Sequence, residues 1–263
     1  MTDTAVTQLH VSLGPREFLV LWQPTAEPGY RCVGTLRRES SEYVFTYSAE
    51  GQTSEIFRGF ANFPDKFAEY RSTELFPLFA SRVMTPRRDG YEEYLVALGL
   101  HDMSPDPFVV LERTLGVSAT DQIQVLPLPE VTEEGRLSFR FLVHGARHVD
   151  PLGEHLARVS PGSALRLVQE RDNPSSARAV LVGDSLSVTR ESALGYVPEV
   201  LCGLVTTLLD TDSVVQVWAE HVNHVGSVDV PAQLRLLVRV NAVVPTHFDV
   251  RDALRLPGAL HAV

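Results

Sequence analysis

Residues 162–210, GSALRLVQERDNPSSARAVLVGDSLSVTRESALGYVPEVLCGLVTTLLD, decide the fold that we expect for the second half of the chain. Apolar and polar residues alternate over residues 165–170, which is typical of a half-buried strand. Residues 172–176 are all turn formers, because Asn and Asp can bond their own backbone and Pro fixes φ. The four apolar residues 179–182 then predict a buried strand.

The rest of this stretch predicts a helix after two more short strands. Residues 183–188 favour a tight turn and a short return strand, and residues 193–197 a last short strand. Pro198 suits the first turn of a helix, where its missing N–H is not needed, and the helix should end near residues 210–213. Tyr196 is expected to pack against this helix. The expected core-facing side chains of the helix are Val200, Leu201, Leu204 and Leu208.

The segments RDNPSSARAVLV (171–182) and ALGYVPEVLCGLVTTLLD (193–210) resemble the core of a HIRAN domain. In that family a turn built on Asn-Pro precedes a strand, and a Gly-Tyr/His-Val/Leu-Pro element leads into a helix. Gly145-Ala146-Arg147-His148 lies where the family has a Gly-x-Arg-aromatic strand end, and the resemblance covers residues 140–243. It implies a small, mainly β, OB-like or SH3-like barrel with one helix that binds DNA, in characterised members at single-stranded ends.

The side chains that follow the Asn-Pro turn depart from the family. In its eukaryotic members an aromatic residue there stacks on a base and an Asp meets the terminal hydroxyl, whereas this chain has Ser175 and Ser176. Val149 replaces the second aromatic residue of the Gly-x-Arg element. Stacking contributes about 1 to 3 kcal/mol per base, so we expect weaker strand binding, and recognition of a free strand end is not implied.

The resemblance and the residue types together select six candidate nucleic-acid contacts. Arg147 comes first, because a guanidinium can bind a phosphate bidentately or stack on a base. His148 occupies the family's aromatic position, and an imidazole can also stack on a base. For each candidate, the alternative is an ordinary surface or partly buried side chain. The six are Arg147, His148, Arg171, Asn173, Pro174 and Arg178, of which Arg171 and Arg178 flank the Asn-Pro turn.

The charge of the chain argues against a nonspecific nucleic-acid-binding protein. The 263 residues include 23 Lys and Arg against 33 Asp and Glu, a formal net charge of −10. Any DNA contact must therefore be local, through a groove lined by arginines, because the overall field repels phosphate. Lys66 is the only lysine, and this preference for Arg, with abundant Ala, Val and Leu, is typical of a GC-rich bacterial genome.

The first half predicts a strand meander followed by helices. The expected strands cover residues 17–22, 30–36, 43–47 and 121–126. The expected helices cover residues 75–84, 89–98 and 106–115. Ser72 and Asp89 should cap the first two helices, and Pro77 is tolerable because it falls in the first turn.

This order of elements resembles the N-terminal subdomain of HipA-type kinases. The resemblance rests on the meander, on LFPLFASRVM (75–84) and YEEYLVALGL (91–100), and on the helix and strand that follow. No glycine loop, catalytic Asp-x-x-x-x-Asn run or metal-binding Asp motif is present, so phosphoryl transfer is not implied. The Pro-rich, acidic residues 126–135 mark the expected boundary between a HipA N-terminal-like α+β domain, residues 1–135, and a HIRAN-like β-barrel domain, residues 136–263.

Gly183-Asp184-Ser185-Leu186 matches the nucleophile block of GDSL-type esterases. Those enzymes place the serine near the start of the chain and need a later Asp-x-x-His to supply the base. This chain meets neither condition, so a hairpin turn is the favoured alternative and we expect no catalytic residue.

No metal ion, cofactor or membrane is expected as a partner. His221 and His224 would point to opposite faces of a strand, and His144 and His148 would lie about 13 Å apart along one. Both cysteines stand in apolar contexts, which is typical of buried free thiols. There is no apolar run of the roughly 18 to 20 residues that span a bilayer, and no secretory signal, so we expect a cytoplasmic protein.

These observations favour a non-enzymatic, HIRAN-type protein that binds single-stranded or distorted DNA. The alternative is a regulatory protein-interaction scaffold that has lost recognition of DNA ends, as Ser175 and Ser176 would allow, with a protein partner at the N-terminal half. An esterase that uses Ser185 is a remote alternative.

Overall fold

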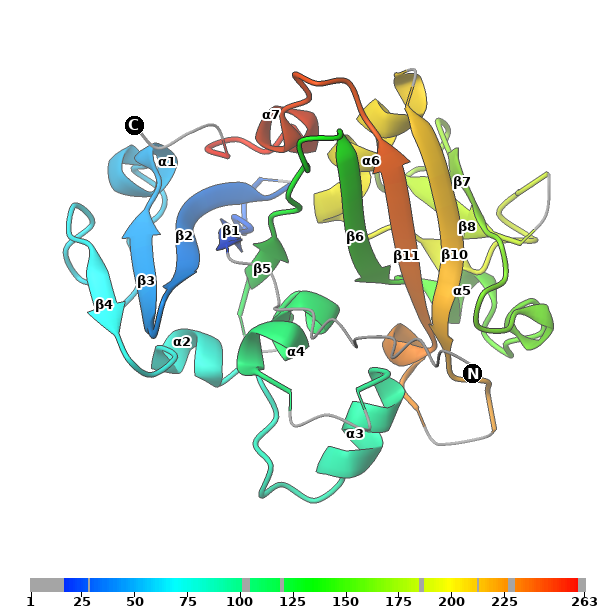
Figure 1. Cartoon of the computed structure of the whole chain (residues 1–263), viewed down its shortest axis with the longest axis horizontal. Helices are drawn as coiled ribbons and strands as arrows, with labels where there is room; N and C mark the ends of the chain where they lie inside the picture. The colour runs from blue at the N-terminus through cyan, green and yellow to red at the C-terminus, as the bar shows by residue number, and fades with distance from the viewer. Residues whose placement is uncertain are drawn as a thin grey trace, which may run out of the picture.

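The computed structural model describes residues 17–27, 29–100, 105–118, 121–184, 187–211, 213–226 and 230–259. Over these residues the chain is a mixed α+β protein, with more strand than helix and with its strands in three sheets (Figure 1). Among these residues, no helix combines the length and the apolar character that crossing a membrane requires.

The first sheet contains the strand meander that the sequence predicts. Its five antiparallel strands have the order β4-β3-β2-β1-β5. Side chains alternate across a strand, so Phe18 and Val20 pack into a Phe-rich cluster on one face, while Leu19 and Leu21 join the main core on the other. The strands are β1 (Glu17–Trp22), β2 (Arg31–Glu39), β3 (Glu42–Tyr47), β4 (Tyr70–Ser72) and β5 (Ile123–Pro127).

The helices of the first half are short, and two of the expected caps are wrong. Ser72 is the last residue of β4, and the first of the expected helices begins only at Pro77, which does fall in the first turn. The next begins after Gly90 without a side-chain cap, so Asp89 does not cap it. Asp106 does cap the third, where its carboxylate accepts a hydrogen bond of 2.8 Å from the N–H of Phe108. These helices are α1 (Ala49–Thr53), α2 (Pro77–Ala80), α3 (Tyr91–Ala97) and α4 (Pro107–Thr114).

The second half contains two three-stranded sheets that share one apolar core with α6. The first sheet has the order β10-β11-β6, and the second β7-β8-β9. The strands are β6 (Arg136–Leu142), β7 (Arg166–Gln169), β8 (Val180–Gly183), β9 (Gly195–Tyr196), β10 (Val214–Val222) and β11 (Leu236–Val243). The helical elements are α5 (Ala146–Val149), α6 (Glu199–Asp210), α7 (Val250–Leu254) and the 3-10 turns η1 (Leu156–Arg158) and η2 (Ala232–Leu234).

The expected OB-like barrel is not closed. Only two isolated bridges, His144 to Tyr196 and Ala164 to Trp218, connect the two sheets within the described part of the chain. β9 has two residues, and Pro198, which ends it, has no N–H to offer a neighbouring strand. So short a strand provides too few hydrogen bonds to join the sheets along their length. Of the return strand expected over residues 186–188, the described residues Ser187 and Val188 lie in no strand.

Helix α6 agrees closely with its prediction. Its four expected core residues are buried, and the helix ends at Asp210. A Cβ on Gly203 would lie 2.1 Å from the backbone oxygen of Leu254, so glycine is required here for α7 to pack against α6. Cys32 and Cys202 are buried free thiols as expected, and burial raises the pKa of each to about 12.

A buried ion network joins α4 of the first half to the sheet β10-β11-β6 of the second. Glu220 on β10 accepts hydrogen bonds from Arg113 at 2.9 Å and from Arg140 at 2.8 Å. Arg140 also binds Glu112 of α4 at 3.1 Å, and Arg239 lies 3.6 Å from Glu220. Burial by itself would raise the pKa of Glu220, but the surrounding arginines outweigh it and the pKa is lowered. Glu220 is therefore held in its ionised form.

Candidate nucleic-acid interface

The Gly145–His148 motif forms a helical turn rather than the strand end that we expected. Strand β6 ends at Leu142, and Gly145 takes φ +68°, a left-handed conformation that L side chains rarely adopt. A Cβ at this position would lie 3.0 Å from the ring of Tyr196. The chain therefore turns into α5, which exposes Arg147 and His148. His144 and His148 do not share a strand, so the geometry considered for a metal pair is also wrong.

Arg147 and His148 contact each other. The Nε of Arg147 donates a hydrogen bond of 3.0 Å to Nε2 of His148. The terminal nitrogens of the guanidinium stay available on the surface for an anion.

A cavity of about 580 Å³ lies beside this turn, between the two halves of the chain. Its described lining residues include no Asp or Glu. Its basic lining residues are Arg82, Arg113, His144, Arg147 and His148. Arg82 and Arg113 are ion-paired with Asp121 and Glu220, so Arg147 is the lining arginine whose charge no described carboxylate neutralises.

The first half contributes two buried arginines to this cavity. Arg82 has a side chain only 1% exposed, and it binds Asp121 at 2.6 Å and the carbonyl of Gly116 at 2.9 Å. Burial lowers the pKa of Arg113, which pairs with Glu220. The Nε atoms of both arginines are buried and have no hydrogen-bond partner among the described residues. Sequence analysis missed both, because nothing near either residue in the chain points to a site in the other half.

The Asn-Pro turn is held by the side chain of Asn173. Its Oδ1 accepts hydrogen bonds from the N–H groups of Ser175 at 2.9 Å and Ser176 at 3.1 Å. Its Nδ2 donates to Glu170. Asn173 thus shapes the turn with its own side chain and leaves Pro174 and Ser175 exposed at the surface.

Tyr196 connects the turn at Asn173 to the turn at Gly145. Its hydroxyl donates a hydrogen bond of 3.0 Å to Glu170 and lies 3.5 Å from Nδ2 of Asn173. Its backbone exchanges hydrogen bonds of 2.9 and 2.8 Å with His144. Burial and the hydrogen bond to Glu170 raise the pKa of this tyrosine. Its ring packs beside a small cluster of Leu181, Val188 and Ala193, all of which lie outside α6, and its hydrogen bonds position both turns.

The remaining two candidate arginines differ in how far they are neutralised. Arg178 forms an ion pair of 3.3 Å with Glu199 at the start of α6. Arg171 is exposed and has no ion pair to any residue that the structure describes. Arg147 and Arg171 are therefore the two motif arginines best able to contact a phosphate.

The described residues add no support for the esterase site or for a metal site. Ser185, the nucleophile of the esterase hypothesis, lies outside the described residues. The neighbouring Asp184 lies 3.6 Å from Arg158 in an ion pair. Across the described ranges there is no group of three or more His, Cys, Asp or Glu side chains that could hold a metal ion.

Comparison with known proteins identifies the second half. Residues 137–236, which include all six candidate contacts, match the model of the HIRAN domain family. One similar solved structure is the crystal structure of the HIRAN domain of human HLTF, at 15% identity and a TM-score of 0.31, covering 46% of this chain and 87% of that one. No curated protein matches the chain. None of these comparisons supports the HipA-like resemblance of the first half. The chain therefore contains a HIRAN domain, at residues 137–236.

Proposed function

We propose that this protein binds single-stranded or distorted DNA at the surface formed by the Gly145 and Asn173 turns. HIRAN domains are generally DNA-binding, and the basic cavity beside Arg147 and His148 carries the proposal for this chain. An exposed arginine that no described carboxylate neutralises, as Arg147 is, favours a phosphate oxygen over any neutral or cationic ligand.

In this proposal Arg147 and Arg171 contact phosphates on either side of Tyr196. Arg178 contributes less, because Glu199 already neutralises part of its charge. His148 offers its ring as a stacking surface, while Asn173 and Pro174 set the shape of the turn. With two phosphate contacts and one platform the strand is bound weakly and without regard to sequence, because phosphate contacts carry no base information.

Ser175 and Ser176 set the expected preference for DNA ends. Their hydroxyls can donate hydrogen bonds to a phosphate, but they provide no ring on which a terminal base could stack. We therefore expect similar affinity for linear and circular single strands. We propose no catalytic step, so the protein acts by binding.

A protein-interaction scaffold is the second candidate function, and one observation favours it. Phe67 is 77% exposed and Ile56 is 49% exposed, both in the first half. Large apolar side chains that are exposed to this degree are available for contact with a protein partner. In this reading the first half recruits a protein, whether or not the HIRAN domain binds DNA.

The deciding experiment is a fluorescence anisotropy titration of the full chain with labelled single-stranded, blunt and 3′-tailed oligonucleotides at low salt. We expect the single strand and the tailed duplex to bind and the blunt duplex to bind more weakly. Arg147→Gln should weaken binding to all of them, whereas Arg58→Gln removes the same charge from an exposed residue of the first half and should change little. Phosphate contacts are strongest at low salt, so the titration is run at about 20 mM. If no binding is detected there, DNA binding is refuted and the scaffold function remains.

A further inference from the structure

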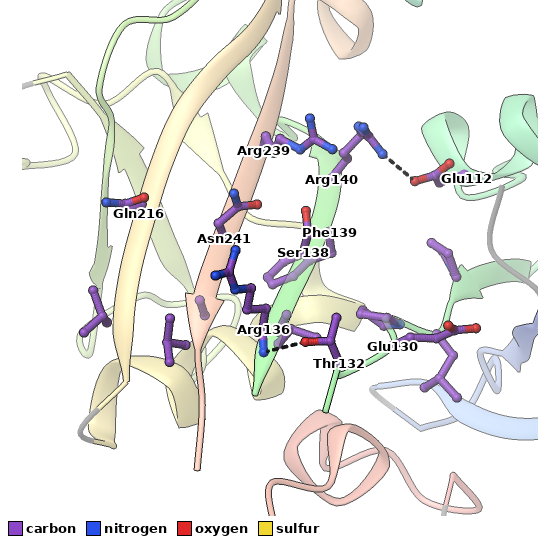
Figure 2. Close-up of a pocket in the computed structure, with 17 residues that line it drawn as sticks. Glu112, Glu130, Thr132, Arg136, Ser138, Phe139, Arg140, Gln216, Arg239 and Asn241 are labelled. Atoms are coloured by element: carbon purple, nitrogen blue, oxygen red, sulfur yellow. Dashed lines mark hydrogen bonds and ion pairs between the residues drawn. The ribbon is translucent and has the colours of Figure 1, made fainter. Parts of the chain in front are cut away.

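A second cavity, of about 870 Å³, lies on the outer face of the sheet β10-β11-β6 (Figure 2). Residues 127–132 and Glu112 of α4 form its opposite side. It shares no lining residue with the basic cavity beside α5. Its size falls in the range of about 300 to 1,000 Å³ typical of small-molecule sites.

The strand register arranges polar side chains on this face in three parallel rows. Alternate residues share a face of a sheet, and successive rows lie about 7 Å apart along the strands. The middle row is neutral and offers amide and hydroxyl groups, and each row beside it contains arginine. The rows are Arg140 with Arg239, then Ser138 with Asn241 and Gln216, then Arg136 with Val243 and Val214.

Two polar atoms on this face are buried and make no hydrogen bond to a described residue. They are Nε of Arg239, which lies 3.6 Å from a carboxylate oxygen of Glu220 in an ion pair, and Oδ1 of Asn241, an acceptor. The two residues are next-but-one neighbours on β11, so their side chains lie on the same face. A ligand group that donates a hydrogen bond would satisfy Oδ1 of Asn241.

Arg136 adds a positive charge that no described residue neutralises in an ion pair. Its side chain is exposed and lines the cavity together with Asn241 (Figure 2). Arg140 differs, because Glu112 and Glu220 hold its guanidinium at 3.1 and 2.8 Å. Arg136 is therefore the lining arginine best placed to bind an added anionic group.

We propose that this cavity binds a nucleoside monophosphate. The edge of a nucleobase carries a hydrogen-bond donor, which is what Oδ1 of Asn241 lacks, and an Asn side chain is a common partner of such an edge. The phosphate meets Arg136, about one row away. One unpaired guanidinium matches one phosphate, so a single phosphate group is sufficient. The bound nucleotide is free or part of a strand, and the measurements below separate these two sources.

Isothermal titration calorimetry of the full chain with AMP, CMP, GMP and UMP tests the proposal. We expect saturable binding of at least one of them, with adenosine and inorganic phosphate each binding more weakly than AMP. Arg136→Gln should weaken the nucleotide by about tenfold, the loss of one charge-assisted hydrogen bond, and leave the nucleoside unchanged. Asn241→Leu should weaken both. Arg58→Gln, which removes an exposed arginine elsewhere, should change neither.

Several outcomes would overturn the nucleotide assignment. One is the absence of saturable binding by any of the four at millimolar concentration, and another is an unchanged affinity in both Arg136→Gln and Asn241→Leu. Inorganic phosphate that binds as tightly as AMP would reveal an anion site only. Arg136 is exposed, so its variant should keep the wild-type melting temperature.

The Arg147→Gln variant separates this site from the proposed DNA surface. It should leave AMP binding intact, and a loss of AMP binding would place the nucleotide at α5 and refute the present site. In that variant a short oligonucleotide that competes with AMP identifies a nucleotide within a strand as the ligand. An oligonucleotide that does not compete, while AMP still binds, identifies the free nucleotide.

Discussion

Replacing Glu220 with glutamine should destabilise the contact between the two halves of the chain. Glu220 accepts hydrogen bonds from Arg113 on α4 and Arg140 on β6, and Arg239 lies 3.6 Å away. Glutamine keeps the size of the side chain and one acceptor oxygen, but it removes the charge. Among the described residues, the remaining carboxylate in an ion pair with these arginines is that of Glu112, which binds Arg140.

The size of the effect follows from the burial of the carboxylate. Removing one partner of a buried ion pair costs about 3 to 5 kcal/mol. The side chain of Glu220 is 20% exposed, and the glutamine oxygen still accepts one hydrogen bond. We therefore expect the free energy of unfolding to fall by about 2 kcal/mol at neutral pH.

The pH dependence of this difference has a definite sign. The pKa of Glu220 is lowered in the folded protein, so its charge stabilises the fold above the ordinary carboxyl pKa. That contribution is lost as the pH falls through the lowered value, because the native carboxylate must then be protonated. The difference between wild type and Glu220→Gln should be full near pH 7 and shrink below about pH 4.5.

Urea denaturation followed by circular dichroism at several pH values measures both effects. Glu154→Gln is the matched control, because Glu154 is exposed and its replacement should stay within about 0.5 kcal/mol of wild type. A Glu220→Gln protein as stable as wild type at pH 7 would refute the role assigned to the network. A loss that persists unchanged in acid would show that the cost comes from something other than the charge.

Three further results are expected. Gly145→Ala should lower the stability by about 1 to 2 kcal/mol, because alanine is strained at this φ and its Cβ would meet the ring of Tyr196; an unchanged melting temperature would contradict this. Cys32 and Cys202 should react with a thiol reagent only after unfolding, because burial raises both pKa values to about 12, and fast labelling of the native protein would disprove it. Arg147→Gln should reduce the magnitude of the slope of log affinity against log salt by about 0.7, the contribution of one phosphate of a single strand. Anisotropy titrations over a salt series measure this slope, and an unchanged slope would show that Arg147 contacts no phosphate.

The elements that sequence alone predicted correctly are those built from local patterns. The meander β1–β3 follows from β-rich runs between polar breaks, and α6 follows from a Pro at its start and apolar residues on one face. The Asn173 turn is also local, because its hydrogen bonds join residues two or three apart. The resemblance that rested on these elements led to the HIRAN domain at residues 137–236.

Features that depend on distant contacts were missed or wrong. The left-handed Gly145 produced a helical turn in place of a strand end, because Tyr196, fifty-one positions further along, packs where a side chain would be. Strand closure depends on how many hydrogen bonds two sheets can share, and β9 is too short for a barrel.

The composition of both cavities was decided by the tertiary structure alone. Arg82 and Arg113 carry no motif, and they meet Arg147 only because α4 packs on the sheet of the second half. The side chains of Arg136 and Asn241 likewise become a site only when β6 and β11 pair in register beneath residues 127–132. Periodicity and turn chemistry act between neighbours in the chain, so a sequence displays them directly. Burial and charge in a cavity depend on which remote side chains the packed fold brings together.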